Sequence, residues 1–168
     1  DNKYFDLLCE FDYKDIEEAR KINKANCYRI KRLKERVSKM LLKGSCIFCT
    51  FNFDDDTLNN TNADTRRRYV RKYLKQFNCD YVANVDYGST NEYIDRKGIK
   101  RVGTGREHYH ALICIDYVPI QWNYGFLFVE KVRIKSSTDI KLSKYISKLT
   151  NHAIKESTKR CCLIYSRS

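Results

Sequence analysis

Hydrophobic positions near the start of the chain recur at the spacing of an amphipathic helix. Residues 15–43 contain no Pro or Gly, and their apolar side chains lie near a 3.6-residue period. The positions that define this period are Ile22, Leu33, Val37, Met40 and Leu41. The pattern predicts one long helix that ends before Gly44.

Two further helices are predicted later in the chain. The first covers residues 64–77, with Asp64 as its N-cap, an apolar stripe and basic residues on the opposite side. The second runs from Asp139, its expected cap, to about residue 149.

Four segments are predicted to be β-strands, because they are short, apolar and rich in β-branched and aromatic residues. They are residues 46–53, 81–87, 107–115 and 126–134. Residues 54–56 are expected to form a polar loop. Residues 88–105 hold four of the six glycines and are expected to form a long polar loop.

These elements mix helices and strands without a regular βαβ repeat. Their order favours an α+β fold, with a central antiparallel β-sheet of about five strands and flanking helices. At 168 residues, the chain has the size of one domain. We expect an N-terminal extension over 1–44, made of an acidic segment and a basic helix, a core over 45–150 and a tail over 151–168. Since the sequence starts at Asp1 without Met, it is expected to be an excised domain.

Charge and aromatic content indicate the class of partner. Lys and Arg number 33 against 21 Asp and Glu, a net charge of +12, and the chain has 13 Tyr, 8 Phe and 1 Trp. Cationic charge with aromatic side chains favours a nucleic acid over a membrane as the partner. The sequence shows no signal-peptide pattern and no apolar run of membrane-spanning length. We therefore expect an intracellular protein, in the cytoplasm of its host cell, or in the nucleus of a eukaryotic host.

The eight cysteines are irregularly spaced, and a chain of this length does not need disulfides, so reduced thiols are expected. Cys46 and Cys49 form a C-x-x-C, yet residues three apart in a strand face opposite sides of a sheet. We predict that they are small buried side chains and not metal or redox groups. Cys161 and Cys162 receive the same interpretation.

The candidate chemistry begins with two histidines, His108 and His110, in the third predicted strand. Alternation turns both imidazoles to one face, where they form either half of a metal site or a hydrogen-bonded surface pair. Asp86, at the end of another predicted strand, is the expected third ligand, although its position also suits a turn former. Glu107 faces the other side and is the weaker candidate. Two imidazoles and a carboxylate suit Mn²⁺ or Mg²⁺ bound beside a phosphate.

Tyr145 and Lys148 lie three residues apart on the last predicted helix, so they share one surface. A phenol is a poor nucleophile at its usual pKa, and a nearby cation or a metal-bound phosphate makes its attack feasible. Lys148 is a candidate for that cation. The alternative is that Tyr145 is one more half-buried aromatic side chain.

Four segments, in this order along the chain, resemble the motifs of the HUH endonucleases, which are replication initiators and relaxases of rolling-circle plasmids and small single-stranded DNA viruses and phages. Residues 48–51 resemble the first strand motif of the family, and residues 85–88 the segment before the histidines. Residues 106–113 are similar to its His-hydrophobic-His motif, and residues 144–148 to its tyrosine motif. The resemblance covers about 45–150 and is greatest to the initiators of small single-stranded DNA phages and related plasmids.

The resemblance implies an HUH nuclease-like fold and a metal-dependent DNA endonuclease and strand transferase. Mn²⁺ or Mg²⁺ held by His108, His110 and Asp86 would polarise a scissile phosphate, and Tyr145, supported by Lys148, would attack it. The implied products are a 5′-phosphotyrosine and a free 3′-hydroxyl that primes rolling-circle replication. The implied partner is single-stranded DNA at an origin stem-loop. The alternative is a non-catalytic module that binds single-stranded nucleic acid, for which charge and aromatic residues suffice.

The sequence departs from the family pattern at three places. Lys141 stands where some phage initiators have a second tyrosine, so a single-tyrosine nickase is implied. Asp86 stands where relatives often have Glu. Residues 98–104 have the glycine spacing of a phosphate loop, but Thr104 replaces its essential Lys. A host or separate helicase and polymerase are therefore expected as partners.

Basic residues near the predicted sheet face are expected to hold the DNA backbone, while aromatic side chains stack on bases. These residues are Arg66, Arg67, Arg68, Arg101 and Arg106. Residues 20–43 carry ten basic side chains and only Glu35 as an acid. This basic helix either contacts a duplex stem or packs on the sheet through its apolar stripe.

Overall fold

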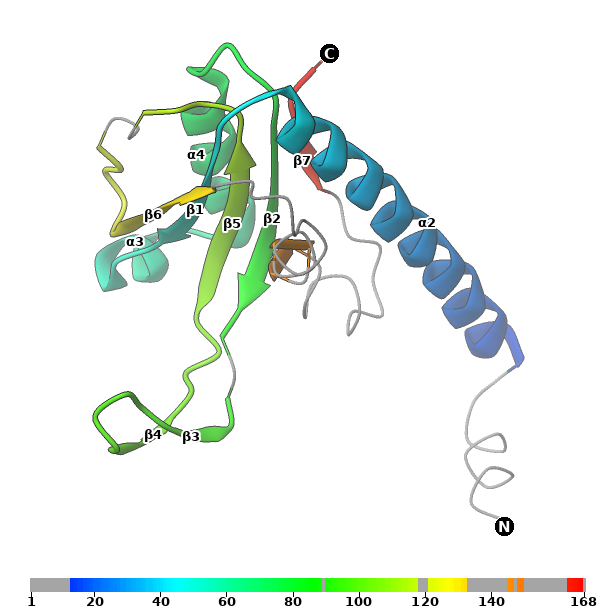
Figure 1. Cartoon of the computed structure of the whole chain (residues 1–168). Helices are drawn as coiled ribbons and strands as arrows, with labels where there is room; N and C mark the ends of the chain where they lie inside the picture. The colour runs from blue at the N-terminus through cyan, green and yellow to red at the C-terminus, as the bar shows by residue number, and fades with distance from the viewer. Residues whose placement is uncertain are drawn as a thin grey trace.

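A five-stranded antiparallel β-sheet forms the centre of the structure, a computed structural model that describes residues 13–88, 90–117, 121–132, 145–146, 148–149 and 163–167 (Figure 1). The strand order is β6-β1-β5-β2-β7, and helices flank the sheet, so the predicted α+β class is confirmed. The strands are β1 (Cys46–Asn52), β2 (Tyr81–Tyr87), β5 (Glu107–Ile113), β6 (Leu127–Val132) and β7 (Ile164–Tyr165). Hydrophobic patterning predicts the first four. The two residues of β7 are too few to show a pattern.

Strand β5 lies in the middle of the sheet and pairs with β1 on one side and β2 on the other. Its apolar residues 111–113 are fully buried, because side chains cover both faces of the sheet at this point. The register sets Asp86 opposite His108 and Thr50 opposite His110. The polar part of β5 therefore lies beside the end of β2.

The described helices include α2 (Tyr13–Lys43), α3 (Asp55–Asn60) and α4 (Ala63–Lys75). The long helix α2 agrees with its prediction. Helix α3 corrects the polar loop expected at residues 54–56. The Asp54 carboxylate accepts a hydrogen bond from the Thr57 backbone N–H at 2.7 Å, which caps the first turn. A six-residue helix without a buried side chain has no apolar stripe from which to predict it.

The N-cap of helix α4 lies two residues before the predicted cap, Asp64. The N-cap is Asn62, whose side-chain oxygen accepts a hydrogen bond from the Thr65 backbone N–H at 2.8 Å. Asp64 lies in the first turn, where its negative charge is favourable at the positive end of the helix dipole. The prediction of Asp64 as the cap was wrong. Asn and Asp suit the N-cap position equally well, so the residue types alone do not distinguish Asn62 from Asp64.

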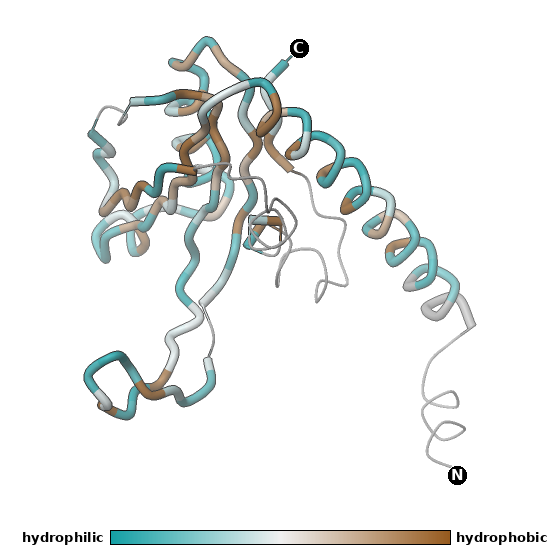
Figure 2. The backbone as a smooth tube through the Cα atoms, in the orientation of Figure 1, coloured by the Kyte–Doolittle hydropathy of each residue, from teal (hydrophilic) through white to brown (hydrophobic). Residues whose placement is uncertain are grey.

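The two faces of the sheet carry separate hydrophobic cores. On one face, Val70 and Leu74 of α4 pack with Phe51 of β1. On the other face, Leu33 of α2 belongs to the same buried cluster as Phe48 of β1. Figure 2 shows apolar residues gathered in the central strands and recurring along α2 between hydrophilic ones. The apolar stripe of α2 thus packs on the sheet, one of the two roles considered for the basic helix.

Residues 88–105 contain a β-hairpin in place of the expected loop. Its strands are β3 (Glu92–Ile94) and β4 (Lys100–Val102), and Gly98 in the turn has a φ of +77°. The Asp95 carboxylate accepts hydrogen bonds from the Lys97 and Ile99 backbone N–H groups at 2.9 and 3.0 Å. The hairpin projects from the edge of the sheet where β2 ends and β5 begins (Figure 1). Its strands are exposed throughout, so they lack the alternation that reveals a strand in a sequence.

Several predictions concern residues at the edge of the described part of the chain. Residues 145–146 and 148–149 are helical, as predicted for 139–149. The other positions of that predicted helix lie outside the described residues. The same holds for predictions at 1–12, 133–134, Cys161 and Cys162. Cys46 and Cys49 are free thiols buried in the two opposite cores, as predicted.

Within the described residues, no helix is both long and apolar enough to cross a membrane.

Gly125, in the turn that leads into β6, is expected to be the glycine least tolerant of substitution. A Cβ atom there would lie 2.2 Å from the Asn52 carbonyl oxygen and 2.7 Å from the Asp54 nitrogen, and φ is +153°. Two backbone hydrogen bonds fix this approach, from Asn52 to Phe126 and from Asp54 to Tyr124, both 2.9 Å. Gly125→Ala should lower the free energy of unfolding by about 2 to 4 kcal/mol in urea denaturation.

Gly44→Ala is the matched control, because a Cβ at Gly44 meets nothing within 4 Å. It should leave the urea midpoint almost unchanged. Equal midpoints for the two variants would contradict the close approach at Gly125.

Candidate metal centre

Three potential ligand atoms converge beside the end of β2. His108 and His110 point to the same face of β5, and Asp86 reaches them from β2. Nε2 of His110 is 3.2 Å from Nε2 of His108 and 3.3 Å from Oδ2 of Asp86, and Nε2 of His108 is 3.7 Å from that oxygen. The three side chains grouped by the sequence thus form one Asp-His-His cluster.

The separations within the Asp-His-His cluster suit one metal ion. Ligand atoms about 2.1 Å from a common cation lie about 3.0 to 3.4 Å apart in octahedral or tetrahedral geometry. Two of the three separations fall in that range, and the third exceeds it slightly. The buried group could therefore hold a cation. Its two nitrogens and one oxygen do not alone fix the identity of the ion, since imidazole also suits Zn²⁺ and Fe²⁺.

The outer nitrogens of both imidazoles have hydrogen-bond partners. His108 Nδ1 lies 3.0 Å from the Arg106 carbonyl oxygen, which can only accept a hydrogen bond, so Nδ1 carries a proton. His110 Nδ1 lies 3.2 Å from the Thr50 hydroxyl, which can accept in the same way. With the proton at Nδ1, the Nε2 lone pair of each ring becomes available to a metal in place of the hydrogen bond that Nε2 donates to Asp86. This is the tautomer needed to bind a metal through Nε2.

Electrostatics within the cluster favour a charged carboxylate. Burial by itself raises the pKa of Asp86, but hydrogen bonds from His108 and His110 and from the Tyr87 N–H lower it well below its usual value. Burial lowers the pKa of His110, and the nearby charges of His108 and Lys148 lower it further against the opposing effect of Asp86. For His108, burial is outweighed by Asp86 and the Arg106 carbonyl, so its pKa is raised. A negative Asp86 and a neutral His110 are the forms that bind a cation.

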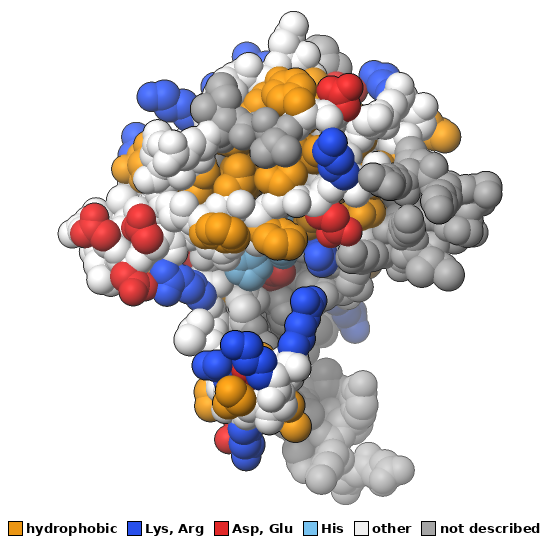
Figure 3. Space-filling view, turned by 60° about the vertical axis from the view of Figure 1, so that its left-hand side comes forward, with side chains coloured by type: hydrophobic (Ala, Val, Ile, Leu, Met, Phe, Trp, Pro, Cys, Tyr) orange, Lys and Arg blue, Asp and Glu red, His pale blue; other side chains and the backbone are white. Residues whose placement is uncertain are grey.

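The Asp-His-His cluster is accessible from solvent. The side chains of His108, Asp86 and His110 are 18%, 11% and 9% exposed. Figure 3 shows histidine at the surface beside an acidic side chain, with the basic and hydrophobic side chains of the β3–β4 hairpin next to it. A substrate group could therefore reach a cation held there.

Tyr145 lies on the same face as the Asp-His-His cluster, separated from it by Phe48. The ring centroids of Tyr145 and Phe48 are 5.0 Å apart, and those of Phe48 and His110 are 5.5 Å apart. The Tyr145 hydroxyl is 3.4 Å from a carboxylate oxygen of Glu130 on β6. Because β1 separates β6 from β5, the backbone of the strand that bears Glu130 lies about 10 Å across the sheet from the histidine strand. Burial, with the charge of Glu130, raises the pKa of Tyr145 to about 12.

Lys148 lies near the Asp-His-His cluster, contacts the same Phe48 ring as Tyr145 and acts electrostatically on His110. Its ammonium nitrogen is 5.3 Å from the centroid of the Phe48 ring. Its charge also acts on His110, whose pKa it lowers. Lys148 therefore supplies positive charge beside the Asp-His-His cluster, where an anionic group would need it.

The three consecutive arginines proposed as DNA contacts lie on α4, which packs on the face opposite to the cluster. Arg66 forms an ion pair with Glu107, in which the side chains are only 12% and 8% exposed. Arg67 is hydrogen-bonded to Tyr109. Arg68 is exposed, and its guanidinium donates to the Thr65 hydroxyl at 3.2 Å. Their contact with DNA stays a prediction, and Arg66 has a structural partner in Glu107.

The two remaining arginines flank the cluster end of the sheet. Arg106 donates to Asp55 at 2.7 Å and to the Phe53 carbonyl oxygen at 2.6 Å. Arg101, on the hairpin, donates to Asp95 at 2.7 Å. Both side chains are largely exposed, so their ion pairs can be exchanged for contacts with phosphates at little cost.

The buried pair of Arg66 and Glu107 gives a stability prediction. Glu107→Ala leaves the Arg66 guanidinium buried without its carboxylate, which should cost about 3 kcal/mol and lower Tm by roughly 10 °C. The control is Asp55→Ala, which removes a carboxylate that is 82% exposed from its pair with Arg106. This variant should leave Tm within about 2 °C. Calorimetry measures Tm for both variants. A similar decrease in Tm in the two would refute a special role for the buried pair.

Sequence reasoning missed three residues that surround the candidate centre. Thr50 bonds to His110, Phe48 lies between His110 and Tyr145, and Glu130 bonds to Tyr145. Alternation places Thr50 and Phe48 on one face of their strand. Which strands are neighbours, and in which register, is set by the tertiary fold, so the contacts could not be predicted.

Comparisons with family models, with curated proteins and with solved structures find no match to this chain. The basis for a function is therefore the chemistry of the side chains that the sheet brings together.

Proposed function

We propose that the protein is a metal-dependent endonuclease that nicks single-stranded DNA through a tyrosine nucleophile, the activity implied by its resemblance to the HUH endonucleases. The observation that carries the proposal is the Asp-His-His cluster of Asp86, His108 and His110, with Lys148 beside it and Tyr145 on the same sheet face. In this proposal, the protein initiates rolling-circle replication at an origin stem-loop and depends on a separate helicase and polymerase.

The donor set suits the chemistry proposed for it. A bound Mn²⁺ or Mg²⁺ would act as a Lewis acid on the scissile phosphate. Asp86, His108 and His110 provide three ligands, which leaves other coordination positions for substrate oxygens. Lys148 adds a positive charge that attracts the phosphodiester and stabilises the charge that develops on it during attack.

The proposed step is an in-line exchange of one phosphodiester for another. The Tyr145 oxygen forms a bond to phosphorus, the bond from phosphorus to the 3′-oxygen breaks, and that oxygen leaves as a hydroxyl after taking up a proton from water. The phenolic proton passes to water during the attack, because the contact of the Tyr145 hydroxyl with Glu130, 3.4 Å away, has to be released first. The energy of the phosphodiester is kept in the phosphotyrosine, so a later attack by a 3′-hydroxyl can rejoin the strand.

The proposal requires a movement of Tyr145. With its hydroxyl bonded to Glu130 and its pKa raised to about 12, the phenol is not in the geometry of attack. Binding of DNA would have to release this hydrogen bond and turn the ring past Phe48. The same contact favours the second candidate, a non-catalytic module for single-stranded nucleic acid, in which Tyr145 is a buried core residue.

One experiment separates the two candidates. The full chain is incubated with a pool of single-stranded oligonucleotides of random sequence, labelled at the 3′ end, with Mn²⁺ or with EDTA. A nickase of this type gives labelled protein that resists SDS in Mn²⁺ and none in EDTA. With a 5′ label, the radioactivity should instead appear in free fragments that a polymerase can extend from their 3′-hydroxyl.

The other outcomes are equally informative. Cleavage without a covalent adduct would mean that water and not a tyrosine attacks the phosphate. Binding without cleavage across the pool would support the non-catalytic module. An adduct of equal yield in EDTA would contradict the role of the Asp-His-His cluster.

A further inference from the structure

A basic surface runs along α2, on the side of β2 that carries β7. It does not include the arginines described above. Helix α2 and strand β7 enclose an open groove of about 740 Å³, which we term the α2–β7 groove. Its cationic side chains outnumber its acidic ones. The cations are Arg29, Arg32, Arg36, Lys39 and Lys43, and the acids are Glu35 and Asp80. The groove therefore attracts an anion.

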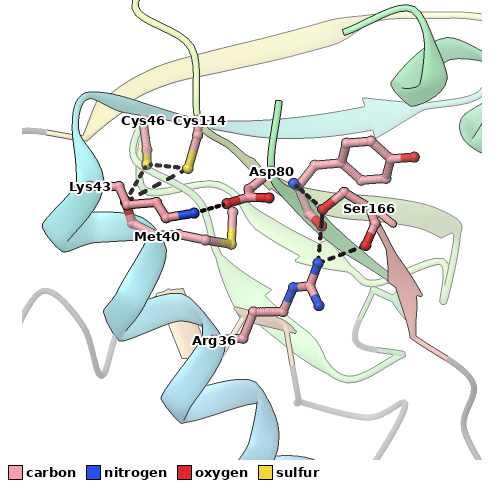
Figure 4. A network of polar contacts seen from close by, with 8 residues as sticks. Arg36, Met40, Lys43, Cys46, Asp80, Cys114 and Ser166 are labelled. Carbon is pink, nitrogen blue, oxygen red and sulfur yellow. Dashed lines mark hydrogen bonds and ion pairs between the residues drawn. The ribbon is translucent and has the colours of Figure 1, made fainter. Parts of the chain in front are cut away.

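Polar contacts between α2 and the sheet hold the walls of the groove in place (Figure 4). Arg36 donates to the carbonyl oxygen and the hydroxyl of Ser166, both at 2.8 Å, and its guanidinium lies 4.6 Å from the centroid of the Tyr165 ring. Lys43 forms an ion pair with Asp80 at 2.9 Å. These residues fasten the helix to β7 and to the start of β2. The groove is thus formed before any ligand binds.

Other groove residues present charge and an aromatic ring to solvent. Arg32 and Lys39 are exposed, and neither forms an ion pair with another described residue. Tyr28 is 61% exposed, and the Arg32 guanidinium lies 5.9 Å from the centroid of its ring. Exposed cations hold phosphates, and an exposed aromatic ring stacks on an unpaired base. Together they are the two components of a site for a single strand.

We propose that the α2–β7 groove binds a segment of single-stranded nucleic acid, with its phosphates at Arg32 and Lys39 and a base stacked on Tyr28. An exposed ring favours a single strand over a duplex, because the bases of a duplex are already stacked on one another. An acidic peptide would satisfy the cations but leave Tyr28 without a planar partner.

The groove is separate from the Asp-His-His cluster. Asp80 lies just before the first residue of β2 and Asp86 near its end, and six residues of a strand span about 20 Å. The inference therefore goes beyond the proposed cleavage and does not depend on it. No residue that lines the groove belongs to the cluster, and the end of the groove at Asp80 lies at a distance from it.

The test measures binding of fluorescein-labelled dT12 to the full chain by anisotropy, in EDTA and over a series of NaCl concentrations. The Arg32→Gln/Lys39→Gln double variant should bind about 10- to 30-fold more weakly in 0.1 M NaCl. The slope of log K against log[NaCl] should fall in magnitude by about 1.4, the value for two lost phosphate contacts on a single strand.

The matched control is Lys31→Gln/Lys34→Gln, which removes the same charge from exposed positions of α2 that do not line the groove. It should weaken binding less than about threefold, with little change in slope. Binding of dT12 elsewhere on the protein is common to both double variants and cancels in the comparison. Equal losses in the two variants would show a diffuse electrostatic attraction and overturn the proposal.

Substitution of the exposed ring tests the stacking. Tyr28→Ala should weaken dT12 binding about fivefold or more, whereas Tyr28→Phe, which keeps the ring, should bind as the parent protein does. Unchanged binding by Tyr28→Ala would refute the stacking role. Preference for a dA12·dT12 duplex, or displacement of dT12 by polyglutamate of equal charge at equal concentration, would assign the groove to another polyanion and overturn the proposal.

Discussion

Tyr145→Phe is expected to abolish the covalent adduct with DNA, a loss of at least about 10³-fold in the rate of strand cleavage, because the phenyl ring has no oxygen to attack phosphorus. The variant should keep its fold. The ring still packs on Phe48, and loss of the hydrogen bond to Glu130 should cost about 1 kcal/mol. Adduct formation with a 3′-labelled oligonucleotide in Mn²⁺, followed on SDS gels, measures the effect.

Tyr87→Phe is the matched control. It makes the same chemical change in an exposed tyrosine that follows the proposed metal ligand Asp86 directly in β2. It should form the adduct at the rate of the parent protein. An adduct that persists in Tyr145→Phe and disappears in Tyr87→Phe would transfer the nucleophile to Tyr87. Mapping of the DNA-linked peptide gives an independent assignment.

Asp86→Asn and His110→Ala should each reduce Mn²⁺ affinity by at least about 100-fold and remove metal-dependent cleavage. Loss of a group that only orients a metal ligand already costs 10- to 100-fold, and these changes remove a ligand itself. Asp86→Asn is the sharper variant, since it keeps the shape of the side chain and removes the charge that the two histidines stabilise. Titration of free Mn²⁺ by electron paramagnetic resonance measures the affinity without any nuclease assay.

Two further variants test whether the effect is local. Asp80→Asn makes the same chemical change just before the start of β2, where the carboxylate pairs with Lys43, and should leave Mn²⁺ binding intact. Thr50→Val removes the hydroxyl beside Nδ1 of His110 and should give a smaller loss, roughly tenfold. Mn²⁺ binding that survives in Asp86→Asn would show that the Asp-His-His cluster is not the metal site.

The histidine pair could be predicted because its geometry is local. A period of two along a strand turns His108 and His110 to one face whatever the strand pairs with, and the apolar residues after them indicate a buried strand. The prediction of Asp86 as the third ligand needed one further assumption, that its strand is the neighbour of the histidine strand. The register of β2 and β5 satisfies that assumption and sets Asp86 directly opposite His108.

Properties that depend on long-range contacts could not be predicted. Arg66 looks like its neighbours in the sequence, yet packing of α4 turns it toward Glu107 on the far face of the sheet. The hydroxyl of Tyr145 bonds to Glu130, a residue that no motif singles out. For α2, the sequence left packing and DNA contact as alternatives. Its apolar stripe packs on the sheet, while part of its basic surface lines the α2–β7 groove, so one helix has room for both roles.

The contact between Arg36 and Ser166 joins residues 130 positions apart, and this has a consequence for the order of folding. Helix α2 leaves the ribosome well before Ser166, the residue whose oxygen atoms accept hydrogen bonds from its Arg36 guanidinium. The apolar stripe of the helix can pack on β1, β2 and β5 as soon as these strands pair, but its contact with Ser166 forms only after β7 adds to the edge of β2. Loss of residues 163–167 should thus leave the Asp-His-His cluster intact while it weakens the docking of the helix, which would keep its contacts with β1, β2 and β5.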